Sequence, residues 1–324
     1  MKKSTVISMI IAGMLILLGA GLFAGAMSAI GWDFSKLSSD EFVTQTVEIT
    51  KSFVAIEIEA DTAKIRFVAS QDDTMRVEYG DIEPVQYRVE VDNGILKIEV
   101  VDTREWYDYI SIGFTPASYV TVYLPAGEYG ALTIRHGTGD IELPDAFTFF
   151  ELDIELSTGD VTVNSPVRNA VSITTDTGDI SLTSAEAGAL AVKTSTGSIK
   201  ITNVSCTGDV SLHVGTGKSH LTNLRCQSLA STGSSGDITM KDVIASGAFE
   251  IRRDTGDVTL ERCDAASIKI QTDTGDVTGT LLSDKVFVYK TDTGDVDLPK
   301  TTTGGTCDIT TDTGDIIITV VTES

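Results

Sequence analysis

The feature that most constrains the fold of this chain is a glycine that recurs every 19 or 20 residues through its C-terminal half. Around most copies the sequence reads Asp-Thr-Gly-Asp or a close variant, as at 176–179, 254–257 and 312–315. A constant register of this kind indicates a repeat protein, in which one unit folds only against its neighbours. The register glycines are Gly139, Gly159, Gly178, Gly197, Gly217, Gly236, Gly256, Gly275, Gly294 and Gly314.

Four positions in each repeat are almost always apolar: seven and five residues before the glycine, and two and four residues after it. Around Gly178 they are Val171, Ile173, Ile180 and Leu182. Spacings of two indicate strands with one buried face, whereas a helix would need spacings of three and four. The sequence therefore predicts an all-β fold, a single-stranded β-solenoid (β-helix) of coils about 19–20 residues long. Ten coils stacked about 4.8 Å apart would form a rod roughly 50 Å long.

The glycine is expected at a tight corner between the two strands of each coil, because glycine readily adopts a positive φ. The aspartate two residues before it is expected to cap that corner as an Asx-turn. On this interpretation the Thr-Gly-Asp signature is structural. We assign residues 131–324 to this regular solenoid.

Residues 46–130 resemble irregular coils or a cap of the same solenoid. Ile56, Ile58, Ile65 and Phe67 repeat the apolar register, with Ala63 in the place of the glycine. The segment at 92–94, Asp-Asn-Gly, fits either a further coil or a plain β-hairpin, since this tripeptide also favours a tight hairpin turn.

An aromatic loop interrupts the pattern between Val101 and Ser118. It contains Trp106, Tyr107, Tyr109 and Phe114. Aromatic residues in a loop are typical of a partner-binding site, and equally of a plug that closes the side or end of a solenoid.

The first 32 residues predict a membrane anchor, followed by a linker at 33–45. No charged residue occurs from Ser4 to Trp32, and about 20 apolar residues suffice to cross a bilayer. Lys2 and Lys3 precede the segment and acidic residues follow it, so the positive-inside rule places the N-terminus in the cytoplasm and the body outside. A cleaved signal peptide is the alternative, because 24–26 reads Ala-Gly-Ala. Both alternatives export the body; the first gives a single-pass protein of the cell membrane.

The composition argues against several classes of function. The chain has 47 acidic and 24 basic residues and a net charge of −23, which disfavours nucleic acid as a partner. Only three histidines are present, and the coil length never changes after Gly139, so no insertion is available to build the walls of a catalytic cleft. We therefore predict no catalytic residues and no enzyme activity.

The four cysteines, Cys206, Cys226, Cys263 and Cys307, form no C-x-x-C motif. All fall in small or apolar columns, which indicates buried thiols. A disulfide between Cys206 and Cys226 in adjacent coils is the alternative, although parallel Cβ vectors suit a disulfide poorly.

The acidic columns at the corners are the one candidate for chemistry. Stacking places like charges near 5 Å apart, which costs roughly 1 kcal/mol per neighbour in water. Hydrogen bonds from corner N–H groups would relieve this repulsion; weakly bound calcium, which prefers oxygen ligands, would relieve it as well. No other cofactor is expected. The candidate calcium ligands are Asp254, Asp257, Asp273, Asp276, Asp292, Asp295, Asp312 and Asp315.

The order of anchor, irregular strands ending in Tyr119-Val-Thr-Val-Tyr-Leu-Pro125, and Thr-Gly-Asp coils resembles a bacterial family of β-strand-repeat proteins called putative adhesins, which includes LiaG-like envelope proteins. The resemblance implies a surface-exposed, non-enzymatic protein. We expect an adhesin or cell-envelope scaffold whose partner is an envelope glycan or protein. An envelope-stress sensor or accessory protein that binds cations or glycans is the alternative.

Overall fold

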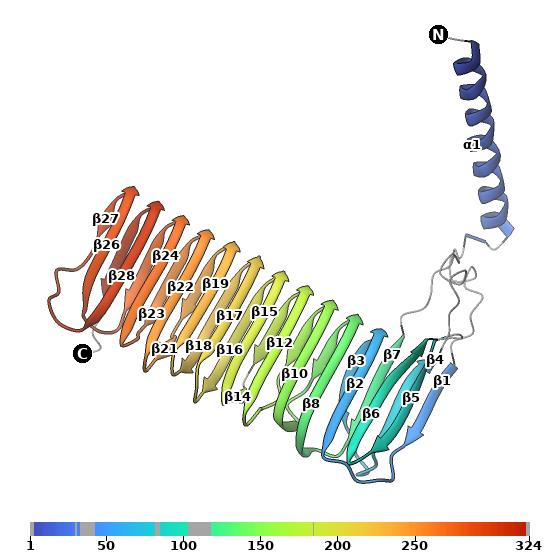
Figure 1. The fold of residues 1–324 in the computed structure, drawn as a ribbon, viewed down its shortest axis with the longest axis horizontal. Helices are drawn as coiled ribbons and strands as arrows, with labels where there is room; N and C mark the ends of the chain where they lie inside the picture. The colour runs from blue at the N-terminus through green and yellow to red at the C-terminus, as the bar shows by residue number, and fades with distance from the viewer. Residues whose placement is uncertain are drawn as a thin grey trace.

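The computed structural model describes residues 3–29, 31–32, 43–81, 85–102, 118–183 and 185–321. It contains one helix, α1 (Lys3–Ala29), and a long rod of stacked strands (Figure 1). Helix α1 is long and apolar enough to cross a membrane. The rod is a β-solenoid, as predicted.

Two sheets run along the rod, and each coil contributes a strand to both. In spatial order, the first sheet is β26 (Lys285–Thr293), β28 (Gly305–Thr313), β24 (Ser267–Thr274), β22 (Ala248–Thr255), β19 (Leu229–Ser235), β17 (Val210–Thr216), β15 (Ala189–Thr196), β12 (Ala170–Thr177), β10 (Phe147–Thr158), β8 (Gly127–Thr138), β2 (Ala55–Thr62), β6 (Ile95–Asp102) and β5 (Val85–Asp92).

The second sheet lies opposite the first, and its strands are named from the N-terminal end of the rod to the other end. Its strands are β1 (Val43–Glu48), β4 (Arg76–Asp81), β7 (Tyr119–Leu124), β3 (Lys64–Ala69), β9 (Ile141–Leu143), β11 (Val161–Val163), β13 (Ile180–Thr183), β16 (Ile199–Cys206), β18 (Ser219–Cys226), β20 (Ile238–Lys241), β23 (Val258–Cys263), β25 (Val277–Leu281), β29 (Ile316–Val320) and β27 (Val296–Asp297). The short strands β14 (Glu186–Ala187) and β21 (Ile244–Ala245) pair beside β16 and β18.

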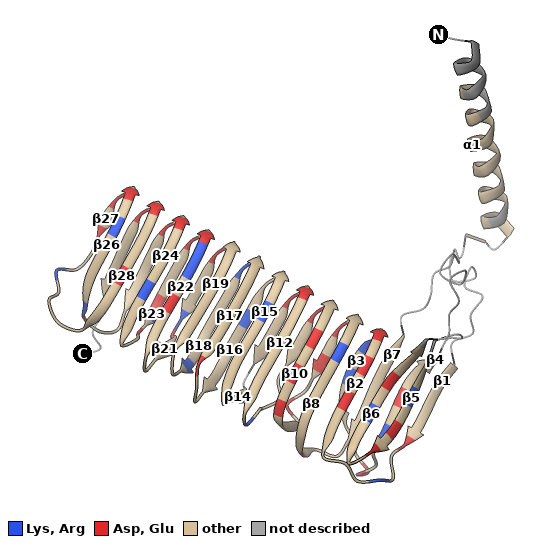
Figure 2. Ribbon diagram, in the orientation of Figure 1, with Lys and Arg blue, Asp and Glu red and all other residues tan. Residues whose placement is uncertain are grey.

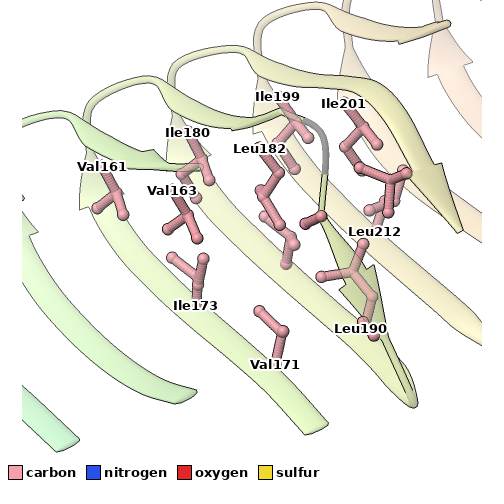
Figure 3. Packing of buried hydrophobic residues seen from close by; sticks show 14 of the residues in the cluster. Val161, Val163, Val171, Ile173, Ile180, Leu182, Leu190, Ile199, Ile201 and Leu212 are labelled. Carbon is pink, nitrogen blue, oxygen red and sulfur yellow. The ribbon is translucent and has the colours of Figure 1, made fainter. Parts of the chain in front are cut away.

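The core lies between the two sheets and is built from the predicted apolar columns. Val171 and Ile173 of β12 face Ile180 and Leu182 of β13, and all four are almost fully buried (Figure 3). The neighbouring coils repeat the arrangement in exact register, since Ile173 pairs with Ile154 and with Val192. The side chains therefore form continuous apolar rows along the rod, which is how stacked repeats bury a core that no single coil could enclose.

At the N-terminal end the coils do not follow the order of the sequence. The coil of β2 and β3 lies between the coil of β6 and β7 and the coil of β8 and β9. Ala63 does stack under the first register glycine, because its N–H donates to the carbonyl of Thr138. The Asp-Asn-Gly segment forms the hairpin: β5 and β6 are antiparallel, and Asn93 and Gly94 both have positive φ. Strands β1 and β4 also pair antiparallel, so this end is a cap built differently from the coils.

At the C-terminal end the last two coils also depart from the order of the sequence. The coil of β28 and β29 is last in sequence but lies between the coil of β24 and β25 and the coil of β26 and β27. Its core residues Cys307, Ile309, Ile316 and Ile318 are almost fully buried. The coil of β26 and β27 has Tyr289 in the column where the coil of β28 and β29 has Ile309, and it forms the end of the rod. The more apolar coil thus occupies the interior layer, which places more apolar surface out of water.

Trp106, Tyr107, Tyr109 and Phe114 lie outside the described residues, as does most of the linker at 33–45. The choice between a binding loop and a plug therefore stays as the sequence leaves it.

Candidate functional site: the glycine corner

The turn at the register glycines, which we call the glycine corner, is the most regular surface of the rod. Each of the ten glycines has a φ between 126° and 155°. A second restriction is added by stacking, because a Cβ at Gly178 would lie 1.9 Å from the carbonyl oxygen of Gly159 in the coil below. The backbones of neighbouring coils therefore approach so closely that a side chain has no room there.

Threonines three residues before the glycine complete the corner in part of the rod. The hydroxyl of Thr194 donates to the carbonyl of Gly178 at 3.1 Å, and that of Thr311 donates to the carbonyl of Gly275 at 3.2 Å. Thr272 and Thr291 make the same bond in their coils. These threonines satisfy the glycine carbonyls, which the strand ladder does not reach. Their role was not predicted from the sequence, although threonine recurs at this position.

The aspartate directly after the glycine links one coil to the next. The carboxylate of Asp160 accepts the backbone N–H of Asp179 at 2.8 Å, and the carboxylate of Asp179 accepts that of Ser198 at 2.7 Å. The same bond recurs at the other end of the rod, from Asp257 to Asp276 to Asp315 to Asp295. We call this row of carboxylates the aspartate ladder.

The predicted Asx-turn by the preceding aspartate is wrong. Within the described chain no hydrogen bond reaches the carboxylates of Asp254, Asp273 and Asp312, whereas Asp292 forms an ion pair with Lys290 at 3.1 Å. The strongly positive φ at the glycine and the stacking of the corners direct the following N–H toward the neighbouring coil. The aspartate that caps it therefore lies after the glycine, one layer below.

The electrostatics of the ladder follow from these bonds. Lys218 and the N–H of Asp257 hold the pKa of Asp237 below its usual value, since both stabilise the charged carboxylate. No group of three or more His, Cys, Asp or Glu side chains that could hold a metal ion occurs among the residues that the structure describes. The strand register and the ladder bonds place the eight candidate calcium ligands in two rows along the corner, and calcium there remains a prediction.

Two charged side chains of the described residues, Arg253 and Lys285, are buried. Arg253 is 2 % exposed, and its Nη2 donates to the hydroxyls of Ser231 at 3.0 Å and Ser219 at 3.3 Å. Gly233 lies beside the guanidinium, and a Cβ there would be 3.1 Å from its Nη1. Burial lowers the pKa of Arg253 to about 10. Two small residues in apolar columns and a glycine in the threonine column thus provide the volume that the arginine fills, a combination visible in the sequence that we did not connect.

The histidines do not converge on a catalytic arrangement in the described part of the chain. Both ring nitrogens of His136 lie against backbone carbonyls, 3.1 Å from that of Ala60 and 2.7 Å from that of Ala63. His213 contacts the hydroxyl of Thr232, and His220 lies on the other sheet. A hollow of about 370 Å³ beside His136 contains Arg135, but Asp153 and Glu155 already pair with that guanidinium.

The four cysteines are buried free thiols. Burial raises the pKa of Cys206 and Cys263 to about 11, and that of Cys226 and Cys307 to about 12. A buried thiol of high pKa is a poor nucleophile, so the cysteines belong to the core.

Comparison with known proteins gives one family and several distant structural relatives. The model of the family described as Toastrack DUF4097 matches residues 53–223 and 214–323. No curated protein matches the chain. A putative adhesin from Bacteroides fragilis is 14% identical, with a TM-score of 0.41 and coverage of 87% of this chain and 98% of its own. A putative adhesin from Parabacteroides distasonis has the same identity, a TM-score of 0.42 and coverage of 84% and 98%. A putative lipid binding protein from that organism is also 14% identical, with a TM-score of 0.39 and coverage of 73% and 96%.

Proposed function

Because this chain belongs to the Toastrack DUF4097 family, we propose that it is a non-enzymatic rod, tethered to the cell membrane and displayed outside the cytoplasm, that serves as an adhesin or envelope scaffold. The family agrees with the β-strand-repeat resemblance found in the sequence; the LiaG-like part of that resemblance stays a prediction. The observation that carries the proposal is that polar side chains at the corner and in the core of the described rod bond to the protein itself. Threonines and aspartates at the corner bond to the next coil, and the arginine in the core bonds to serines.

A rod of this construction provides reach and a long exposed surface. Its coils are held together by main-chain bonds and by apolar rows that run along the rod. The coil length does not change after Gly139, and a rod without inserted loops suits contact with an extended partner such as an envelope glycan or protein. The negative charge spread along the rod disfavours nucleic acid as that partner (Figure 2).

Helix α1 supports the tether. Its apolar span lies near the N-terminus, and Lys2 and Lys3 precede it in the sequence. The positive-inside rule then directs the rod away from the cytoplasm.

The topology is tested with reporters fused after Ser324 of the full chain. A reporter active only outside the cytoplasm should give signal, and one active only inside should give none. The opposite pattern would contradict the proposal. A reporter that is active outside but released from the membrane fraction would identify α1 as a cleaved signal.

The adhesive role is tested with the full chain in lipid vesicles mixed with isolated cell envelopes. Vesicles carrying the chain should sediment with the envelopes, and vesicles carrying only α1 should stay in solution. Binding should survive replacement of His136, His213 and His220 by Ala one at a time. Soluble sugars released from the envelopes in proportion to the amount of chain would disprove the non-enzymatic assignment.

A further inference from the structure

The two ends of the rod are closed in different ways. At the N-terminal end, Tyr79 of β4 and Tyr87 of β5 pack at 5.5 Å between ring centroids and are only 6 % and 7 % exposed. At the other end, Tyr289 occupies the equivalent core-facing register, above the fully buried Ile309, yet it is 55 % exposed. Among the residues that the structure describes, nothing covers the apolar core at β26 and β27. We call this end of the rod the distal tip (Figure 1).

Both strands of the distal tip are edge strands. β26 ends the first sheet and β27 ends the second, and in the described chain no strand lies beyond either. Val286 and Val288 add apolar surface on the outer face of β26, where they are 39 % and 53 % exposed. Long exposed apolar edges of this kind are unusual unless another strand pairs with them, and repeat proteins need a polar cap at their ends for solubility.

From these observations we propose that the distal tip binds a second copy of this chain, tip to tip, so that β26 pairs antiparallel with the partner's β26 across a two-fold axis. The N-terminal end of the rod shows the geometry, since there antiparallel strands cover the parallel coils. This inference deepens the proposed function, on which its biological meaning rests, by naming the partner. The two anchors then lie at opposite ends of the joined rods, as they would for chains on facing membranes.

The side chains of β26 favour one register. Phe287 and Tyr289 face the core, while Val286 and Val288 face outward. A two-fold axis through Val288 places Phe287 opposite the partner's Tyr289 and Val288 opposite the partner's Val288, so aromatic and apolar pairs form on both faces. An axis through Lys290 would instead oppose two lysines. Isologous pairing of one patch with itself is also the commonest symmetry of protein dimers.

The charges allow approach at the tip and oppose it elsewhere. Between 284 and 300 the chain has three lysines and four aspartates, so the tip is close to neutral on a chain of net charge −23. Lys285 points inward to Asp264 at 2.6 Å, and Lys290 pairs with Asp292. Two rods therefore repel each other along their sides and least at their tips.

The size of the contact sets its strength. A nine-residue strand spans about 30 Å and packed sheets lie about 10 Å apart, so with side chains each tip presents roughly 500 Å². A dimer would bury about 1,000 Å² in total, which is typical of weak association. We expect a Kd between about 1 and 100 μM, strengthened when many chains are displayed on one membrane.

The test uses the full chain inserted as one copy per lipid nanodisc, so that α1 is shielded in lipid. Sedimentation should show particles with two discs that increase with concentration over the micromolar range, and electron microscopy should show two discs joined by one long rod. Discs that remain single at about 100 μM would overturn the proposal.

Charge variants test the register. Val288→Lys and Val288→Glu should each weaken pairing at least about tenfold, because like charges meet across the axis; an equimolar mixture of the two should restore it. Phe150→Lys, a residue that is also 53 % exposed but lies on another coil, is the matched control and should pair like the wild type. Melting temperatures within a few degrees of the wild type should show that all three variants fold. Pairing that survives both single variants, or a mixture that fails to pair, would overturn the proposal.

Failure of this inference can be separated from failure of the proposed function. Vesicles carrying the full chain should cluster, and those carrying Val288→Lys should not. Discs that pair without vesicle clustering would support the tip contact and contradict an adhesive role between membranes. Single discs with vesicles that still bind envelopes would overturn the tip contact and leave the adhesin standing.

Discussion

Two separate restrictions exclude a Cβ at the register glycine. The first, a positive φ, follows from the tight turn and is predictable from sequence. The second is the carbonyl of the coil below, only 1.9 Å from the place of a Cβ at Gly178, and it appears only when the coils stack. Gly178→Ala should therefore cost more than the usual strain of a positive φ.

We expect Gly178→Ala to destabilise the chain by about 2–4 kcal/mol, measured by chemical denaturation. Gly127→Ala is the control, because that glycine has no positive φ and nothing lies within 4 Å of the added Cβ. It should stay within about 0.5 kcal/mol of the wild type. Equal effects of the two substitutions would contradict the close stacking at the corner.

Arg253 gives a second test at the residue scale, because its side chain fills the volume that the small residues Ser231 and Gly233 leave in the core. Ser231→Ile restores the apolar column but collides with the guanidinium, whose Nη2 lies 3.0 Å from the serine hydroxyl. Alone, it should destabilise the chain by about 1–3 kcal/mol. In an Arg253→Thr background, the same change should stabilise it, because it fills the space that the arginine leaves. Thermal unfolding of the four chains measures the cycle, and a cost of the same sign in both backgrounds would refute the account.

At the scale of elements, most of the fold could be read from the sequence because one register repeats. The columns around Ile173, and the place of Ala63 under Gly139, needed only spacing and residue type. The order of the terminal coils could not be read in this way. The coils present similar rows and a similar corner, so a coil can stack on more than one other. Burial of the more apolar coil favours the observed order. That corner N–H groups donate to the aspartates was predicted, but the coil that supplies each N–H could not be read from spacing, because the partner lies in the next coil.

The order of the last coils can be checked by cross-linking. Lys269 of β24 lies beside Asp308 of β28, whereas stacking in sequence order would place it beside Val288. A photo-reactive amino acid in place of Lys269 should therefore attach to peptides from 305–313, identified by mass spectrometry. Attachment mainly to peptides from 285–293 would show that the coils stack in sequence order.

At the scale of the whole molecule, the rod accumulates carboxylates along one corner (Figure 2). Each ladder aspartate uses one oxygen for the N–H of the next coil, as Asp276 does for Asp315 at 2.8 Å. Like charges about 5 Å apart still repel by roughly 1 kcal/mol per neighbour in water, and the stack adds this term in every layer. The rod should therefore gain stability from anything that neutralises the corner.

We predict that calcium does so better than sodium. A ligand that binds only the folded rod stabilises it by about 2.7 kcal/mol at a hundredfold excess over its Kd. Millimolar CaCl₂ should then raise the melting temperature of the full chain more than NaCl of equal ionic strength. Asp276→Asn with Asp295→Asn should remove the excess, because asparagine keeps the oxygen that accepts the N–H of Asp315 and loses the charge. Identical shifts with CaCl₂ and NaCl would mean that the carboxylates serve only as hydrogen-bond acceptors between coils, and that the corner binds no specific ion.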